Sequence, residues 1–296
     1  MPIDGSGEIQ LTDLYNEFTG THSGSEEIQL SDFHDEGNAP ATGEIQLATD
    51  FYGTSGASPA ALELDIDGSN DGDSLVLIHA TAFDFGTNDF TLEGWFRSDR
   101  THAGGPTSGW RALFALMTGA GYDGYGGNIW LRHNSEAVEW NWSNAAGGTL
   151  CDFMSSNSQT PTEWFHFAAV MDNGTCEMFI DGVSGGTASR NGTSVDASAL
   201  RIGISTSGTA DWQGYMDEIR ISNNARYTGN FTPSETEFAS DNNTVVLLHM
   251  NGDNGGQVFT NSATGTAAAA VTITVGDDAH TDTSYGIGTT NDVDNE

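Results

Sequence analysis

Short apolar runs separated by turn residues follow one another from residue 60 to residue 222, and they constrain the fold more than any other feature of the chain. In the run 90–97, Phe90, Leu92 and Phe96 occupy alternate positions and therefore share one face of a strand. The run 137–143 repeats this pattern with Val138, Trp140 and Trp142. No helical periodicity extends beyond a turn or two. The pattern predicts an all-β protein made of two packed antiparallel sheets.

Two segments refine this prediction. The run 164–171 is apolar on both faces, which is typical of a central strand between two layers. The run 177–183 contains Asp181-Gly182, a pair that favours a tight hairpin turn. The chain also contains 38 Gly, 15 Phe and 7 Trp in 296 residues, which suits many turns around an aromatic-rich core.

The segment 54–59 has the composition of a linker and divides the chain. We expect residues 1–53 to form a separate amino-terminal segment and residues 60–240 to form the main β domain. Residues 241–296 contain two more apolar runs and an acidic tail. These strands are expected to complete the same sandwich. The alternative is a truncated second module, whose exposed edge would need a partner chain.

The amino-terminal segment contains Glu-Ile-Gln-Leu three times, each followed closely by an Asp and an aromatic residue. Ile-x-Leu suits a short strand, and a unit of this size cannot bury its own apolar face. It must therefore stack on its copies or on another protein. The residues predicted to dock in this way are Ile9, Leu11, Ile28, Leu30, Ile45 and Leu47.

The charge of the chain excludes two classes of partner. It carries 42 acidic and 8 basic residues, and the formal net charge is -34. Nucleic-acid binding requires basic residues that displace phosphate counterions, so we expect no nucleic-acid partner. We likewise expect no membrane insertion, because no apolar run approaches the roughly 20 residues of a spanning helix. The start of the sequence has neither the basic nor the apolar region of a secretory signal peptide.

Cys151 and Cys176 are the two cysteines, too few to indicate a disulfide framework. Each lies in an apparent strand, so buried free thiols are the simpler interpretation and one disulfide is the alternative. The eight histidines show no zinc-binding spacing.

Several motifs, taken in order, resemble the laminin-G-like, concanavalin-A-like jelly-roll family over roughly 160 residues. They are Phe90-Thr91-Leu92-Glu93-Gly94-Trp95-Phe96, Trp164-Phe165-His166-Phe167-Ala168-Ala169-Val170, Met178-Phe179-Ile180-Asp181-Gly182, Leu200-Arg201-Ile202-Gly203 and Gly214-Tyr215-Met216-Asp217-Glu218-Ile219-Arg220-Ile221-Ser222. The resemblance implies an antiparallel two-sheet jelly-roll sandwich, preceded here by the small repeat-containing segment.

Two further features are similar to proteins of tailed bacteriophage particles. One is the segment 225–233 followed by 243–252, which contains Leu-Leu-His; the other is the set of amino-terminal repeats. In the phage proteins the Leu-Leu-His strand usually precedes the jelly roll, whereas here it follows Ser222. The resemblance implies a location on the virion surface and other virion proteins as partners.

The segment 65–73 is rich in oxygen ligands, which are the donors that Ca²⁺ prefers. It does not match an EF-hand loop, because Ile78 stands where the closing Glu would be. Laminin-G-like relatives often bind Ca²⁺ at a rim of the sandwich, and Asp217 could approach this loop. The simpler alternative is a solvated acidic turn. The candidate calcium ligands are Asp65, Asp67, Asp71, Asp73 and Asp217.

The Gly-rich loop 119–128 and two nearby tryptophans have the composition of a sugar-contact surface, where aromatic rings stack on sugars and polar side chains bind hydroxyls. The alternative is that these aromatic residues belong to the core or rim. The candidate glycan-contact residues are Trp110, Tyr122, Asp123, Tyr125, Asn128 and Trp130.

A catalytic alternative rests on Glu63, Asp65 and Asp67, because glucanases of this fold carry a Glu-x-Asp-x-Glu strand. Here Asp67 replaces the second Glu. Successive carboxylates on one face of a strand are about 6.5 to 7 Å apart, so the two end carboxylates are too far apart for a retaining pair without a bulge. We therefore expect no enzyme and no catalytic residues, and the alternative is a glycan-cleaving hydrolase.

Together these features predict a non-enzymatic virion surface protein, either a tail or fibre component or a capsid decoration, with a lectin-like module. Its expected partners are virion proteins, further copies of itself, for example in a trimer, and a host surface glycan. Ca²⁺ is the one cofactor expected.

Overall fold

The computed structural model describes residues 60–64, 72–99, 110–117, 126–132, 137–143, 149–160, 162–191, 197–208 and 210–286. The chain divides into two units, Met1–Ser58 and Pro59–Glu296, and all described residues belong to the second. The predicted docking residues, from Ile9 to Leu47, therefore lie outside the described residues and remain a prediction.

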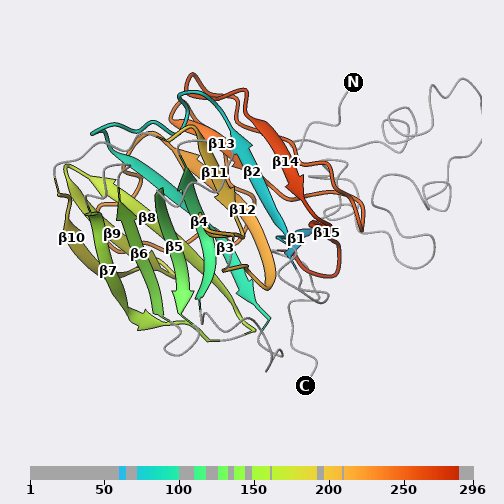
Figure 1. Cartoon of the computed structure of the whole chain (residues 1–296), viewed down its shortest axis with the longest axis horizontal. Helices are drawn as coiled ribbons and strands as arrows, with labels where there is room; N and C mark the ends of the chain where they lie inside the picture. The colour runs from blue at the N-terminus through green and yellow to red at the C-terminus, as the bar shows by residue number, and fades with distance from the viewer. Residues whose placement is uncertain are drawn as a thin grey trace, which may run out of the picture. The chain divides into compact units, whose positions relative to one another are not determined.

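The described residues form two antiparallel sheets and no helix, which confirms the all-β jelly-roll sandwich (Figure 1). Sheet A has the order β10-β9-β8-β3-β12-β1-β15, and β13 also pairs with β12. Its strands are β1 (Ala61–Leu64), β3 (Phe90–Ser98), β8 (Trp164–Asp172), β9 (Thr175–Ile180), β10 (Val183–Ser189), β12 (Gly214–Ser222), β13 (Thr244–Leu248) and β15 (His280–Asp282).

Sheet B has the order β14-β2-β11-β4-β5-β6-β7. Its strands are β2 (Ser74–Ile78), β4 (Trp110–Met117), β5 (Gly126–Arg132), β6 (Ala137–Ser143), β7 (Thr149–Ser158), β11 (Ala199–Ile202) and β14 (Thr272–Gly276). The loops between several of these strands lie outside the described residues.

The core lies between the two sheets and follows from the alternation in the sequence. Phe90, Leu92 and Phe96 of β3 are fully buried in it, together with Trp140 and Trp142 of β6. Aromatic rings from both sheets meet there, since the rings of Phe90 and Trp142 stack with their centroids 5.3 Å apart. Burial of these large apolar surfaces is the main favourable contribution to folding.

The central position predicted for the run 164–171 is confirmed, because β8 lies between β3 and β9. The hairpin predicted at Asp181-Gly182 joins β9 to β10, and both turn residues have positive φ, 50° and 72°. This geometry matches the two-residue turns that the right-handed twist of antiparallel strands favours.

The carboxy-terminal strands join both sheets, and the last two pair with strands from the start of the domain. β13 continues the ladder of β12, β14 pairs with β2, and β15 pairs with β1. The strand β12 changes partner from β1 to β13 along its length, and its ladder to β3 is irregular between Asp217 and Arg220. At this point Glu218 has a φ of 51°.

Residues 223–243, which we call the strap, connect β12 to β13 and pack on the outer face of sheet A. Tyr227 and Phe231 of the strap stack on each other and pack against Ala168, Val170 and Phe179 of the sheet. Phe238 packs against Trp95 and Leu247. The strap therefore buries part of the face of sheet A that points away from the core, over β3, β8, β9 and β13.

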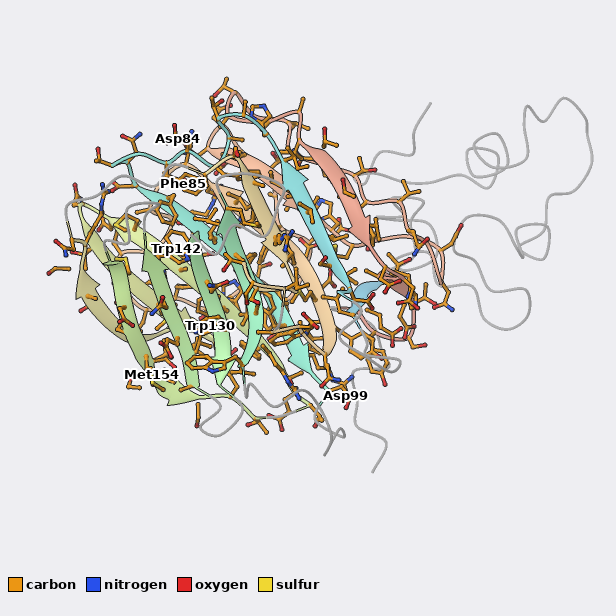
Figure 2. All side chains as sticks on the ribbon, in the orientation of Figure 1. Asp84, Phe85, Asp99, Trp130, Trp142 and Met154 are labelled. Atoms are coloured by element: carbon orange, nitrogen blue, oxygen red, sulfur yellow. A yellow bond between two sulfur atoms is a disulfide. The ribbon has the colours of Figure 1, made fainter. Side chains whose placement is uncertain are left out.

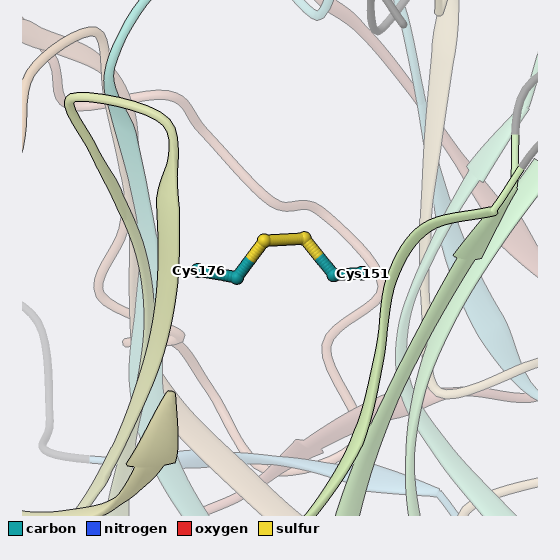
Figure 3. The surroundings of a disulfide bond; sticks show 2 residues. All are labelled: Cys151 and Cys176. Atoms are coloured by element: carbon teal, nitrogen blue, oxygen red, sulfur yellow. A yellow bond between two sulfur atoms is a disulfide. The ribbon is translucent and has the colours of Figure 1, made fainter. Parts of the chain in front are cut away.

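A disulfide joins Cys151 of β7 to Cys176 of β9, with 6.4 Å between the Cα atoms (Figure 3). The sequence left a disulfide and two free thiols open, and the structure shows the disulfide. Because β7 belongs to sheet B and β9 to sheet A, the bond links the two layers covalently.

Candidate functional site: the outer face of sheet B

The outer face of sheet B is positioned by the alternation of its strands. Ile129 and Leu131 of β5 point into the core, so Asn128 and Trp130 lie on the opposite face. The register places Trp130 between Ala112 of β4 and Glu139 of β6. The residues that define this face over β4 to β7 are Trp110, Asn128, Trp130, Glu139, Asn141, Asp152 and Met154.

Trp110 and Trp130, which the sequence predicted as glycan contacts, lie together on this face. Their ring centroids are 4.6 Å apart at an interplanar angle of 50°, and both side chains are partly exposed. The indole Nε1 of Trp130 has no hydrogen-bond partner among the described residues. Figure 2 labels Trp130 and Met154 on neighbouring parts of this sheet, and Met154 is 40% exposed.

Asn128 has a structural hydrogen bond that the sequence could not reveal. Its Nδ2 donates to Thr206 Oγ1 at 3.2 Å, and its Oδ1 accepts from the Thr206 backbone N–H at 2.9 Å. The pair ties β5 to the segment that follows β11. Glycan contact by Asn128 remains a prediction, and Tyr122, Asp123 and Tyr125 lie outside the described residues.

The polar groups beside the tryptophans are amides and carboxylates. Asn141 Nδ2 donates to Asp152 Oδ1 at 3.3 Å, and Glu139 is directly opposite Trp130 in the β5–β6 ladder. Asp152 is exposed, whereas Glu139 is mostly buried. These groups accept hydrogen bonds from hydroxyls, and the amide also donates them.

The two described members of the predicted calcium set are both buried. Asp73 Oδ1 accepts a hydrogen bond from the Asp278 backbone N–H, and Asp217 Oδ1 accepts one from the Glu218 backbone N–H. Neither belongs to a cluster of metal-binding side chains within the described residues. Asp65, Asp67 and Asp71 lie outside the described residues, so this site remains a prediction.

The structure does bring together Glu218, Glu237 and His249, a set that sequence reasoning missed. One potential ligand atom from each lies within 4.8 Å of the others. His249 Nδ1 is 2.7 Å from Glu218 Oε1, and the hydrogen bond to Glu218 raises the pKa of His249 despite its partial burial. The other oxygen, Glu218 Oε2, accepts the Phe238 backbone N–H. The contact therefore already serves to hold the strap against β12 and β13.

Glu63, the first carboxylate of the catalytic alternative, is engaged by its neighbours. Tyr215 donates its hydroxyl to Glu63 Oε1 at 3.2 Å, and His280 Nε2 lies 3.2 Å from Glu63 Oε2. Burial and the nearby Glu63 charge raise the pKa of Tyr215. Both oxygens thus have partners on β12 and β15.

A second carboxylate, Glu93, is completely buried under the strap. It accepts hydrogen bonds from Arg220 Nε at 2.8 Å and from the Tyr227 hydroxyl at 2.6 Å, and His166 Nε2 lies 3.4 Å away. Burial alone would raise the pKa of Glu93, but the interactions with His166 and Arg220 outweigh it and lower the pKa to about 2. This network fastens the strap to sheet A.

The fold and this arrangement define a laminin-G-like jelly-roll domain. The family model of the concanavalin A-like lectin/glucanase superfamily matches residues 70–230, and the chain belongs to this family. No curated protein sequence matches the chain. No helix among the described residues is long and apolar enough to cross a membrane.

Several solved structures are similar in fold. A proposed carbohydrate binding protein from Bacteroides ovatus is 13% identical, with a TM-score of 0.45, and the match covers 76% of this chain but only 62% of that one. The CBM40 of the Ruminococcus gnavus IT-sialidase, bound to α2,3-sialyllactose, is 11% identical (TM-score 0.43, 56% of this chain, 91% of that one). Domains LG4-5 of the mouse laminin α1 chain are 15% identical (TM-score 0.39, 60% and 47%).

Proposed function

We propose that this protein is a non-enzymatic, lectin-like attachment module of a tailed-phage particle, and that it binds a glycan through the outer face of sheet B. The observation that carries the proposal is the partly exposed Trp110–Trp130 pair beside hydroxyl-binding side chains. Aromatic rings offer flat apolar surfaces to the C–H faces of sugars, and amide and carboxylate groups bind their hydroxyls.

The arrangement of the two sheets supports this choice of face. The strap covers the outer face of sheet A over β3, β8 and β9, whereas Met154 and Asp152 remain exposed on sheet B. The whole chain carries a formal charge of -34. A neutral glycan is therefore the favoured ligand, because an anionic one would be repelled.

The virion role rests on the amino-terminal repeats and on the segments 225–233 and 243–252, which resemble phage particle proteins. In this proposal the apolar residues of the repeats dock the protein to the particle or to sister copies. They are Ile9, Leu11, Ile28, Leu30, Ile45 and Leu47. The jelly roll then faces outward. Tail fibre and capsid decoration are two placements of the same module.

Binding rather than catalysis is proposed because the Glu63 carboxylate is occupied by Tyr215 and His280. A hydrolase would require a free pair of carboxylates on either side of the scissile bond. Ca²⁺ is proposed as a cofactor of the 65–73 segment, whose carboxylates suit that ion.

The test is binding of the labelled full chain to candidate host cells and to an array of neutral and sialylated glycans, with and without a calcium chelator. We expect Trp130→Ala and Trp110→Ala each to weaken binding at least about tenfold, as for other aromatic contacts at binding sites. The matched control is Trp164→Ala, which removes a partly buried tryptophan from sheet A.

Equal binding by the wild type and both tryptophan variants would contradict the outer face of sheet B as the site. Absence of binding to every cell and glycan would contradict the lectin-like role. If the wild type binds without the chelator and does not bind with it, glycan binding requires Ca²⁺. Asp71→Asn and Asp73→Asn would then be the next variants.

A further inference from the structure

A groove of about 750 Å³ lies at one end of the sandwich, away from the outer face of sheet B. Its walls come from four places: the connection between β2 and β3, the first residues of the strap, Val245 of β13, and the segment 267–270. Figure 2 labels Asp84 and Phe85 at this end, ahead of β3, and Asp99 at the opposite end of that strand. The volume is in the range of sites that bind small molecules.

The backbone of each wall is held by hydrogen bonds. His79 Nδ1 accepts the backbone N–H groups of Thr81 and Ala82, which fixes the start of the β2–β3 connection. The Ala269 carbonyl accepts Asn261 Nδ2 at 2.8 Å, and its N–H donates to the Val245 carbonyl. The groove is therefore a preformed feature, and binding would not have to order its walls.

Several polar side chains that line this groove make no hydrogen bond to other described residues. The side chains of Asp84, Asn88 and Asn223 are exposed and make no hydrogen bond to another described residue. Asn224 Oδ1 is buried and has no hydrogen-bond partner in the described part of the chain, while its Nδ2 donates to the Ala225 carbonyl. Buried polar atoms are nearly always paired, so an acceptor left unpaired at a groove indicates a missing donor.

The chemistry of the lining selects the ligand. It contains the carboxylates of Asp84 and Asp89 and no Arg, and His79 already accepts two hydrogen bonds at Nδ1. An anionic ligand would meet no opposite charge there. Amides and carboxylates complement O–H donors, and the run Ala267–Ala270 offers an apolar surface to C–H groups. The volume is also far larger than a single metal ion needs.

We propose that this groove is a second saccharide site, which binds a neutral, hydroxyl-rich sugar unit through Asp84, Asn88, Asn223 and Asn224. This site goes beyond the proposed function, because it shares no residue with the outer face of sheet B. Two sugar sites on one chain would let a branched or repeating glycan bind at two points, which increases the overall affinity without new contacts.

The experiment is an NMR titration of the full chain carrying both Trp110→Ala and Trp130→Ala, so that the outer face of sheet B does not contribute. The probes are the methyl glycosides of galactose, glucose, mannose and N-acetylglucosamine at millimolar concentrations. We expect at least one of them to shift the backbone amide signals of Asn88, Asn223 and Ala268. Adding Asn88→Ala and Asn223→Ala should weaken that response at least about tenfold.

The matched control is Asn243→Ala, since Asn243 is an exposed neighbour of Asn223 that does not line the groove. If none of the four glycosides moves the groove signals, the proposal is wrong. It is also wrong if Ca²⁺ moves them and the sugars do not, or if sialyllactose binds as tightly as the neutral sugars. These outcomes leave the proposed function standing, because that function is tested on the intact tryptophan pair.

Discussion

Tyr227 of the strap donates a hydrogen bond of 2.6 Å to Glu93 of β3, across a sequence separation of 134 residues. The Glu93 carboxylate is fully buried and also accepts Arg220 Nε, so a single acidic group joins the strap, β3 and β12. Hydrogen bonds to a buried charge are stronger than neutral ones. The strap is thus fastened to sheet A by polar contacts as well as by its aromatic side chains.

Replacing Tyr227 by Phe removes this hydrogen bond and keeps the ring that packs on Phe231. We expect the free energy of unfolding to fall by about 1.5 to 3 kcal/mol, because the buried carboxylate loses a donor. Urea unfolding followed by tryptophan fluorescence measures the change. Tyr285→Phe is the control, because its ring packs on Tyr215 near the β15 edge of sheet A and not on the strap. An equal, small effect in both variants would contradict a special role for Tyr227.

The lowered pKa of Glu93 predicts that the folded protein becomes less stable as the pH decreases. Its pKa falls from an ordinary 4.5 to about 2 on folding, so its contribution to stability is present above pH 4.5 and is lost as the pH decreases toward 2. The loss is on the order of 1 to 3 kcal/mol for this group. Unfolding measured between pH 5 and pH 2.5 should show a shallower decline in Glu93→Gln. A decline of unchanged slope would mean that other carboxylates account for it.

The disulfide predicts a loss of stability on reduction. It closes a sequence separation of 25 residues between Cys151 and Cys176, for which chain entropy gives about 3.5 kcal/mol. We expect dithiothreitol to lower the urea midpoint of the wild type. The variant with both cysteines replaced by Ser should start at that lower midpoint and not respond to the reductant. A wild type that is insensitive to reduction would contradict the prediction.

The strap packs closely against the β9–β10 turn at Gly182, which leaves no room for a side chain there. A Cβ atom at Gly182 would overlap the carbonyl oxygen of Phe231. The backbone N–H of Phe231 also donates a hydrogen bond to the Gly182 carbonyl. Gly182→Ala should therefore destabilise the protein by several kcal/mol, through both positive φ and steric overlap. Gly174→Ala is the matched control, since Gly174 also has positive φ but no atom within 4 Å of the added carbon. Equal unfolding midpoints for the two variants would show that the close approach has no cost.

Local sequence was sufficient for the inward and outward faces of individual strands such as β6, although it placed Gly126 to Asn128 in a loop whereas β5 begins at Gly126. The alternation that puts Trp140 and Trp142 in the core also puts Asn141 outside, because successive side chains of a strand point to opposite faces. Trp110 and Trp130 were glycan candidates because of the composition around the Gly-rich loop 119–128. Only the β4–β5 ladder shows that their rings lie together on one face.

Contacts between distant segments could not be predicted in this way. Nothing in the spacing of Glu93, Arg220 and Tyr227 indicates that they share one buried site, and nothing around Cys151 names Cys176 as its partner. The groove lined by Asn88, Asn224 and Ala268 likewise combines three segments that are far apart in the chain.

The sequence by itself determined the strands, the apolar and polar faces of each strand, the turn at Asp181-Gly182 and the strong negative charge, because these depend on neighbouring residues and composition. Only the tertiary structure decided which sheet the strap covers, which face stays open for a ligand and which polar groups are paired or left unpaired. Those properties depend on the order of strands across the two sheets, which the period of a single strand does not specify.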